Sequence, residues 1–137
     1  MDMATAARRW TVEMVRSLPD DGNRYEVVDG ILLVSPAPSW PHQNAVGELH
    51  VLLSSYLRDH PIGHAMVAPA DVEYDNENMV EPDVFVVPLV GDRLPRSWQE
   101  AGRLMLAVEV LSPSTKRADR VVKRRLYQRG MRKTRAP

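Results

Sequence analysis

The clearest periodic segment runs from His42 to Asp59, where apolar residues recur at three- and four-residue steps. This spacing places them on one face of a helix. Ser39 is a suitable N-cap, and Pro41 suits the first turn. The pattern predicts one long amphipathic helix whose apolar face consists of Val46, Leu49, Leu52, Leu53, Tyr56 and Leu57.

Two apolar runs before this helix predict a β-hairpin. Arg24–Val28 and Ile31–Val34 have strand length and are separated only by Asp29-Gly30. That dipeptide favours a type I′ turn, because both of its positions need a positive φ. Further runs of strand length lie at 64–68, 71–74, 80–87 and 106–111.

Three shorter helices complete the pattern. The first covers residues 12–18 behind the cap Thr11, and a single turn lies around Trp98 in the loop 90–103. The last runs from Lys116 to Gln128 after the capping sequence 112–115, with Val121, Val122 and Leu126 as its apolar positions. The mixture predicts an α/β fold (α+β, with one mixed sheet) whose helices pack on the faces of the sheet.

Two acids interrupt the apolar strands at 80–87 and 106–111. Asp83 follows Pro82, which places it near the start of its strand, and Glu109 has apolar neighbours on both sides. Carboxylates are costly to bury unless they are paired or bind a cation. If the strands are neighbours, Asp83 and Glu109 can share one divalent ion, for which oxygen ligands are suitable. The alternative is two partly exposed acids at unrelated strand ends.

The composition is that of a globular domain and excludes several kinds of site. The chain has 137 residues, 44% hydrophobic and 26% charged, as expected for one globular domain. It has no cysteine, which excludes disulfides, thiolate zinc sites and a cysteine nucleophile. The N-terminus lacks the apolar core of a signal peptide, and no apolar run approaches the ~20 residues of a membrane span. We therefore expect a cytoplasmic protein that does not enter the membrane.

The charge is balanced overall but distributed unevenly. Residues 116–137 carry ten Lys or Arg and one acid, so residues 1–115 hold eight bases and seventeen acids. A basic segment of this kind can engage a phosphate backbone. It can equally be a solvated helix face.

Several motifs, in this order, resemble the Uma-two family of bacterial proteins within the PD-(D/E)xK restriction-endonuclease-like superfamily. The matching segments cover roughly residues 11–130. They are Tyr25-Glu26-Val27-Val28-Asp29-Gly30, Pro36-Ala37-Pro38 with His42-Gln43, Pro82-Asp83, Glu109-Val110-Leu111-Ser112-Pro113-Ser114-Thr115, and Asp119-Arg120 with Lys123-Arg124 and Tyr127.

The resemblance implies a metal-dependent DNA endonuclease that hydrolyses phosphodiester bonds. Asp83 and Glu109 would be ligands of a catalytic Mg²⁺ or Mn²⁺, with Glu26 assisting. The superfamily usually has a lysine two residues after the glutamate, but here that residue is Leu111. In the Uma-two branch a lysine of the next helix is thought to replace it, and Lys123 is in that position.

Each role has a structural alternative. Lys123 lies four residues after Asp119, so an i,i+4 salt bridge on a solvated helix face also explains it. His42 can serve to satisfy a helix end, which we favour over a contact to the site. Tyr25 and Tyr127 are expected to cover the edge of the core, and the turn alone explains Asp29.

The end of the chain departs from the family. Relatives continue after Gly130 with an apolar strand, whereas residues 131–137 have no strand pattern. We expect one domain over 1–130, C-terminally incomplete, and a non-family tail over 131–137. An exposed sheet edge, marginal stability and weakened cleavage would follow. A non-catalytic nucleic-acid-binding or structural remnant is the alternative function. A homodimer is left open, because the sequence gives no route to the oligomeric state.

Overall fold

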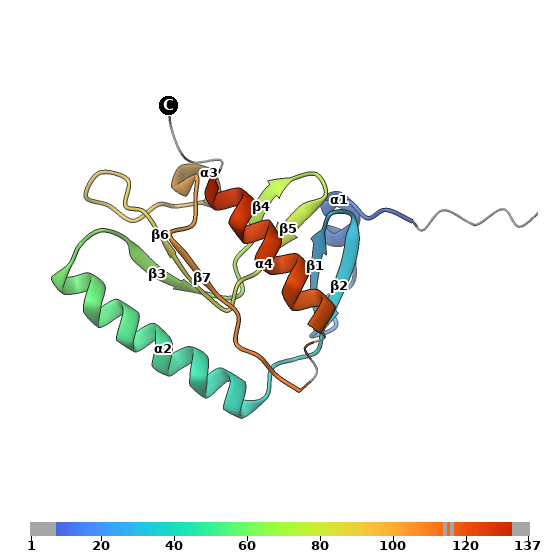
Figure 1. Cartoon of the computed structure of the whole chain (residues 1–137), viewed down its shortest axis with the longest axis horizontal. Coiled ribbons are helices and arrows are strands. Elements are labelled where there is room, and N and C mark those ends of the chain that lie inside the picture. Colours follow the sequence, from blue (N-terminus) through green and yellow to red (C-terminus); the bar gives the residue numbers. More distant parts are fainter. Residues whose placement is uncertain (1–7, 114, 116, 133–137) are drawn as a thin grey trace, which may run out of the picture.

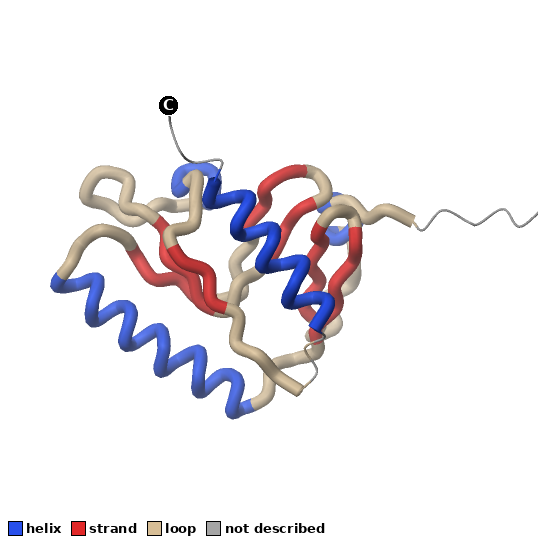
Figure 2. The backbone as a smooth tube through the Cα atoms, in the orientation of Figure 1, coloured by secondary structure: helices blue, strands red, loops and turns tan. Residues whose placement is uncertain are grey.

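The computed structural model describes residues 8–113, 115 and 117–132. Figure 1 shows the arrangement of its elements, and Figure 2 separates helices, strands and loops. In chain order they are α1 (Val12–Arg16), β1 (Arg24–Val28), β2 (Ile31–Ser35), α2 (Trp40–Asp59), β3 (His64–Val67), β4 (Val72–Asp75), β5 (Asn78–Val80), β6 (Val84–Val87), α3 (Trp98–Ala101), β7 (Leu106–Val108) and α4 (Arg117–Arg132). None of these helices has both the length and the apolar character that crossing a bilayer requires.

The strands form two antiparallel sheets, with the orders β2-β1-β5-β4 and β3-β6-β7. The expected α+β class is confirmed, but the expected single mixed sheet is wrong. The predicted strand over 80–87 is in fact divided, because β5 ends at Val80 and β6 begins at Val84. Pro82 lies between them and has no N–H group to donate to a strand ladder. The segment Glu81-Pro82-Asp83 therefore crosses from one sheet to the other.

The hairpin of β1 and β2 follows the turn chemistry of its sequence. Asp29 and Gly30 have φ values of 49° and 75°, the positive values that the type I′ prediction requires. The strands pair from Arg24 opposite Ser35 to Val28 opposite Ile31. This register places Arg24 and Glu26 on the same face of β1, because side chains alternate along a strand.

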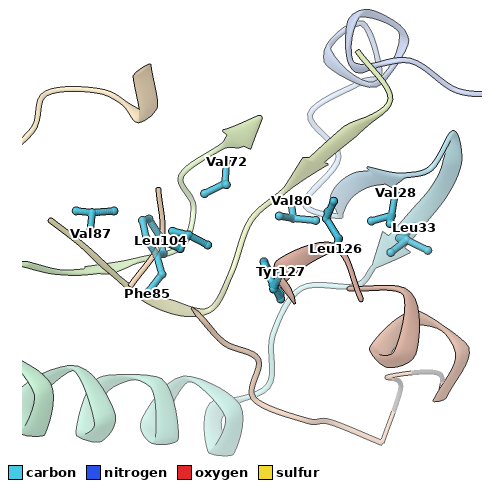
Figure 3. Close-up of a cluster of buried hydrophobic side chains, with 9 residues drawn as sticks. All are labelled: Val28, Leu33, Val72, Val80, Phe85, Val87, Leu104, Leu126 and Tyr127. Carbon is cyan, nitrogen blue, oxygen red and sulfur yellow. The ribbon is translucent and has the colours of Figure 1, made fainter. Parts of the chain in front are cut away.

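The main core cluster joins the two sheets to α4. Its buried members are Val28, Leu33, Val72, Val80, Phe85, Val87, Leu104, Leu126 and Tyr127. Figure 3 shows Leu126 and Tyr127 of α4 beside Val80 and Val28 of the four-stranded sheet. Of the apolar positions predicted for this helix, Leu126 is buried and Val122 packs against the cluster. Val121, the third apolar position, is 40% exposed and lies outside the core cluster.

The long helix α2 begins as predicted, since the Ser39 hydroxyl accepts a hydrogen bond from the His42 amide. It lies along the three-stranded sheet and contacts β3 (Figure 1). Only part of its apolar face is buried. Val46 is its buried residue, whereas Leu52 and Tyr56 are 67% and 55% exposed.

The region around β7 differs from the prediction. The strand ends at Val108 and not at residue 111, and it forms an edge of its sheet. Leu106 and Leu111 are 39% and 56% exposed there. The helix α4 continues through residues 131 and 132, which are therefore helical. Three parts of the prediction lie outside the described residues: Ser114 of the predicted cap, Lys116 at the start of the predicted helix, and residues 133–137 of the predicted tail.

Candidate active site

Asp83 and Glu109 lie at the same end of the β6–β7 pair. Val84 of β6 pairs with Val108 of β7 in an antiparallel ladder. Asp83 directly precedes β6 and Glu109 directly follows β7, so the same register places these two residues opposite each other. Residues opposite each other in this register share one face of the sheet. Both side chains line one open cavity of about 930 Å³. Glu109 is thus beyond its strand, not within it as predicted, because regular pairing ends at Val108.

Asp83 is buried and held from three sides. Its Oδ1 accepts a hydrogen bond from Arg24 Nη1 at 2.9 Å. Its Oδ2 accepts one from the Val110 amide at 2.7 Å and lies 3.3 Å from His42 Nε2. Arg24 Nη1 also donates to the Glu81 carbonyl, so the strand β1 fixes the segment that carries Asp83. The carboxylate orientation is therefore set by β1, α2 and the residue after Glu109.

Glu26 is fully buried, and its charge is neutralised by Lys123. Lys123 Nζ lies 2.6 Å from Glu26 Oε1, an ion pair without the angular geometry of a hydrogen bond. Glu26 Oε2 accepts a hydrogen bond from the Glu81 amide at 2.8 Å. Burial of Lys123 disfavours its charge, but the carboxylates of Glu26 and Glu109 raise the pKa of the ammonium above its ordinary value. Lys123 is therefore a cation within the site.

Glu109 is shared between two side chains of α4. Tyr127 donates a hydrogen bond from its hydroxyl to Glu109 Oε1 at 2.6 Å, and Lys123 Nζ lies 3.4 Å from the same oxygen. Burial raises the pKa of Glu109, against the opposing effect of Lys123, and the charges of Glu26 and Asp83 add to the rise. A carboxylate in this environment is stabilised in its charged form by any additional cation.

The structure brings together all four residues predicted for catalysis. Glu26 comes from β1 of the four-stranded sheet, Asp83 and Glu109 from the segments that flank β6 and β7, and Lys123 from α4. The alternative reading of Lys123, a salt bridge with Asp119 on a solvated face, is wrong. Its side chain is only 10% exposed, and its ammonium is directed at Glu26 and Glu109.

Three site contacts go beyond the predictions from the sequence. Arg24 has no predicted role, although its place two residues before Glu26 on β1 puts both side chains on one face of that strand. Ser39, and not the His42 side chain, caps α2, and the His42 ring approaches Asp83. Tyr127 covers the core as predicted and also binds Glu109. Tyr25 is partly buried at the edge of the core, as expected, where it packs against a smaller buried cluster of Val12, Val15, Val27 and Met79.

The side chains of the site limit which metal ions it could bind. No three His, Asp or Glu side chains in the described part of the chain are grouped so that they alone could hold a metal ion. Two carboxylates on one face of a cavity fit an ion such as Mg²⁺, which takes one or two carboxylates and fills its remaining positions with water or phosphate oxygens. Within the described residues, Glu109 Oε2 has no hydrogen-bond donor of its own.

Most of the chain also matches a known protein family. Residues 12–132 match the Uma2 family model, described as "Putative restriction endonuclease". Among curated proteins, none matches this chain. The match covers most of the 137 residues and includes all four predicted catalytic residues. The chain therefore belongs to the Uma2 putative restriction endonuclease family, and its helix-flanked α+β structure is the restriction-endonuclease-like fold expected from its sequence.

Proposed function

We propose that this protein is a metal-dependent nuclease that hydrolyses phosphodiester bonds in DNA. The observation that carries the proposal is that Asp83, Glu109 and Lys123 line one cavity, with Glu26 paired to Lys123 behind its wall, in a member of the Uma2 family. The arrangement of two carboxylates, a further acid and a lysine is suited to phosphoryl transfer.

Asp83 and Glu109 would hold the metal, Mg²⁺ or Mn²⁺. When bound, such an ion supplies an activated water and neutralises the charge that develops on the phosphate. The Glu109 carboxylate suits this role because burial already disfavours its charge, and a dication would compensate for that. Asp83 contributes a carboxylate that hydrogen bonds from Arg24 and the Val110 amide hold in a fixed orientation.

Lys123 and Glu26 then act as a unit beside the metal ligands. The Lys123 ammonium holds Glu26 and Glu109 in fixed positions and supplies positive charge close to where a phosphate would lie. It takes the place of the strand lysine, since the corresponding position is Leu111, an exposed residue beyond the end of β7. Tyr127 orients Glu109 from the following turn of α4.

A second function, nucleic-acid binding without cleavage, is favoured by one observation. Every carboxylate of the site already has a cationic partner in the protein, Arg24 for Asp83 and Lys123 for both glutamates. This network is complete without a metal ion. It would therefore persist in a protein that has lost catalysis.

Cleavage of supercoiled plasmid DNA in Mg²⁺ or Mn²⁺ tests the proposal, with Asp83→Asn and Glu109→Gln as variants. We expect nicking by the unaltered protein and a loss of at least a hundredfold in each variant. Calorimetric titration with Mn²⁺ should show one site that both variants weaken. Equal nicking by the unaltered protein and both variants would indicate a contaminating nuclease, and absence of both metal binding and nicking would leave the non-catalytic function.

A further inference from the structure

Two arginines on α4 line the cavity and have no partner among the residues that the structure describes. Arg120 and Arg124 line its wall, are exposed and lie one helical turn apart. Within the part of the chain that the structure describes, neither forms an ion pair or a side-chain hydrogen bond. The other Lys and Arg side chains lining the cavity, Lys123 and Arg24, are each paired with a carboxylate.

Four arginines elsewhere in the described part of the chain are paired with acids. Arg9, Arg16, Arg93 and Arg129 each lie within 3 Å of a carboxylate oxygen, in pairs with Glu77, Glu73, Glu100 and Asp29 respectively. No acid among the described residues occupies the guanidiniums of Arg120 and Arg124 in this way, so they can bind an anion from outside. A guanidinium offers a planar fork of donors that matches the oxygens of a phosphate.

We propose that Arg120 and Arg124 bind successive phosphates of a DNA strand that enters the cavity along the N-terminal half of α4. This inference rests on the proposed function, which requires a phosphodiester to reach Asp83 and Glu109. The two arginines are separated by about 6 Å along the helix axis, at 1.5 Å per residue. A DNA strand carries one phosphate for about every 3.4 Å of its axis, so two phosphates of one strand lie within reach.

The positively charged side chains of α4 that line the cavity differ in how deeply they are buried. Residues 120, 123, 124 and 127 are spaced at three and four positions, which places them on one side of α4. Lys123 and Tyr127 are buried against Glu109, whereas Arg120 and Arg124 remain at the opening. Asp119 is the acid on this wall, so the two arginines leave a net positive charge there.

Binding of labelled DNA in EDTA, followed by fluorescence anisotropy over a series of salt concentrations, tests the inference without cleavage. Arg120→Ala and Arg124→Ala should each weaken binding roughly tenfold at low salt, the loss of one charged contact. Each should also reduce the slope of log Kobs against log salt by about 0.9 for duplex or about 0.7 for single-stranded DNA, which distinguishes the two forms.

Arg125→Ala is the matched control, since Arg125 is exposed on the same helix but does not line the cavity. It should leave both affinity and slope close to those of the unaltered protein. Three outcomes would overturn the inference. They are salt slopes that are equal in all variants, a loss of affinity in Arg125→Ala as large as in the other two variants, and no DNA binding by the unaltered protein. Tighter arginine-dependent binding of an RNA of the same sequence would overturn the assignment to DNA.

Cleavage in Mg²⁺ is scored separately, so that the two proposals can fail independently. Arginine-dependent binding with no cleavage by the unaltered protein supports this inference and contradicts the nuclease. Cleavage and binding that are both unchanged in the arginine variants support the nuclease and contradict this inference.

Discussion

Lys123 and Glu26 form an ion pair of 2.6 Å in the interior, where the Glu26 side chain is 0% exposed and that of Lys123 is 10% exposed. The two residues come from α4 and β1, so the pair ties the helix to the four-stranded sheet. Each charge has been removed from water, and each depends on the other for compensation.

Replacing Lys123 with methionine should therefore be strongly destabilising, by about 3–5 kcal/mol, because Glu26 would remain buried as an uncompensated charge. The double variant Lys123→Met/Glu26→Gln removes both charges and should recover most of that loss. Urea denaturation of the unaltered protein, the two single variants and the double variant measures the coupling. Additive losses in the double variant would show that the pair does not contribute as described.

Tyr127→Phe removes the hydrogen bond that lowers the pKa of Glu109. Glu109 would then titrate at higher pH and bind Mn²⁺ more weakly near neutrality, with a stability loss of about 1–3 kcal/mol. Calorimetric titration at two pH values measures the first effect and thermal unfolding the second. Tyr25→Phe serves as the control, because the Tyr25 hydroxyl binds the exposed Asp21 away from Glu109. Metal affinity that is identical in the two variants would contradict a positioning role for Tyr127.

Glu81 should make the stability depend on pH. Burial and the charge of Asp71 raise the pKa of Glu81 to about 7, against the opposing effect of Arg24. The folded protein thus binds this proton more tightly than the unfolded chain does, and stability from Glu81 is lost as pH rises from about 4.5 towards 7. Glu81→Gln should be more stable than the unaltered protein at pH 8 by about 1–2 kcal/mol, after allowance for partial solvation.

The advantage of Glu81→Gln should disappear below pH 4.5, where Glu81 is protonated in both states. Unfolding measured across pH 4–8 tests this sign. A variant that is less stable at pH 8 would show that the contact between Glu81 and Arg24, at 3.8 Å, outweighs burial.

Gly130→Ala should be destabilising by about 1–3 kcal/mol, although alanine normally stabilises a helix relative to glycine. A methyl group at this position of α4 would lie 2.5 Å from Tyr74 Cε1, and the Tyr74 ring also contacts Trp98. Gly47→Ala in α2 is the control, since a methyl group there meets nothing within 4 Å. Thermal unfolding should shift down for the first variant and stay or shift up for the second. A rise in both would mean that Tyr74 moves aside freely.

The sequence by itself determined most of the local structure. The Asp29-Gly30 turn, the Thr11 and Ser39 caps and the periodicity of α2 are decided by interactions between residues close in the chain. These features could be predicted because dihedral preferences and hydrophobic periods act over a few residues. The prediction of Glu26, Asp83, Glu109 and Lys123 as site residues comes instead from the order of the family motifs, and their catalytic roles stay predictions.

Only the tertiary structure decided how those residues meet. The contact of Arg24 with Asp83 spans 59 positions, and those of His42 with Asp83 and Tyr127 with Glu109 span 41 and 18. Local rules cannot anticipate such pairs, because they depend on how the two sheets and α4 pack together. The direction in which the Lys123 side chain points also depends on this packing. Its spacing from Asp119 allowed a surface salt bridge, but burial of Leu126 and Tyr127 turns that side of α4 towards Glu26 and Glu109.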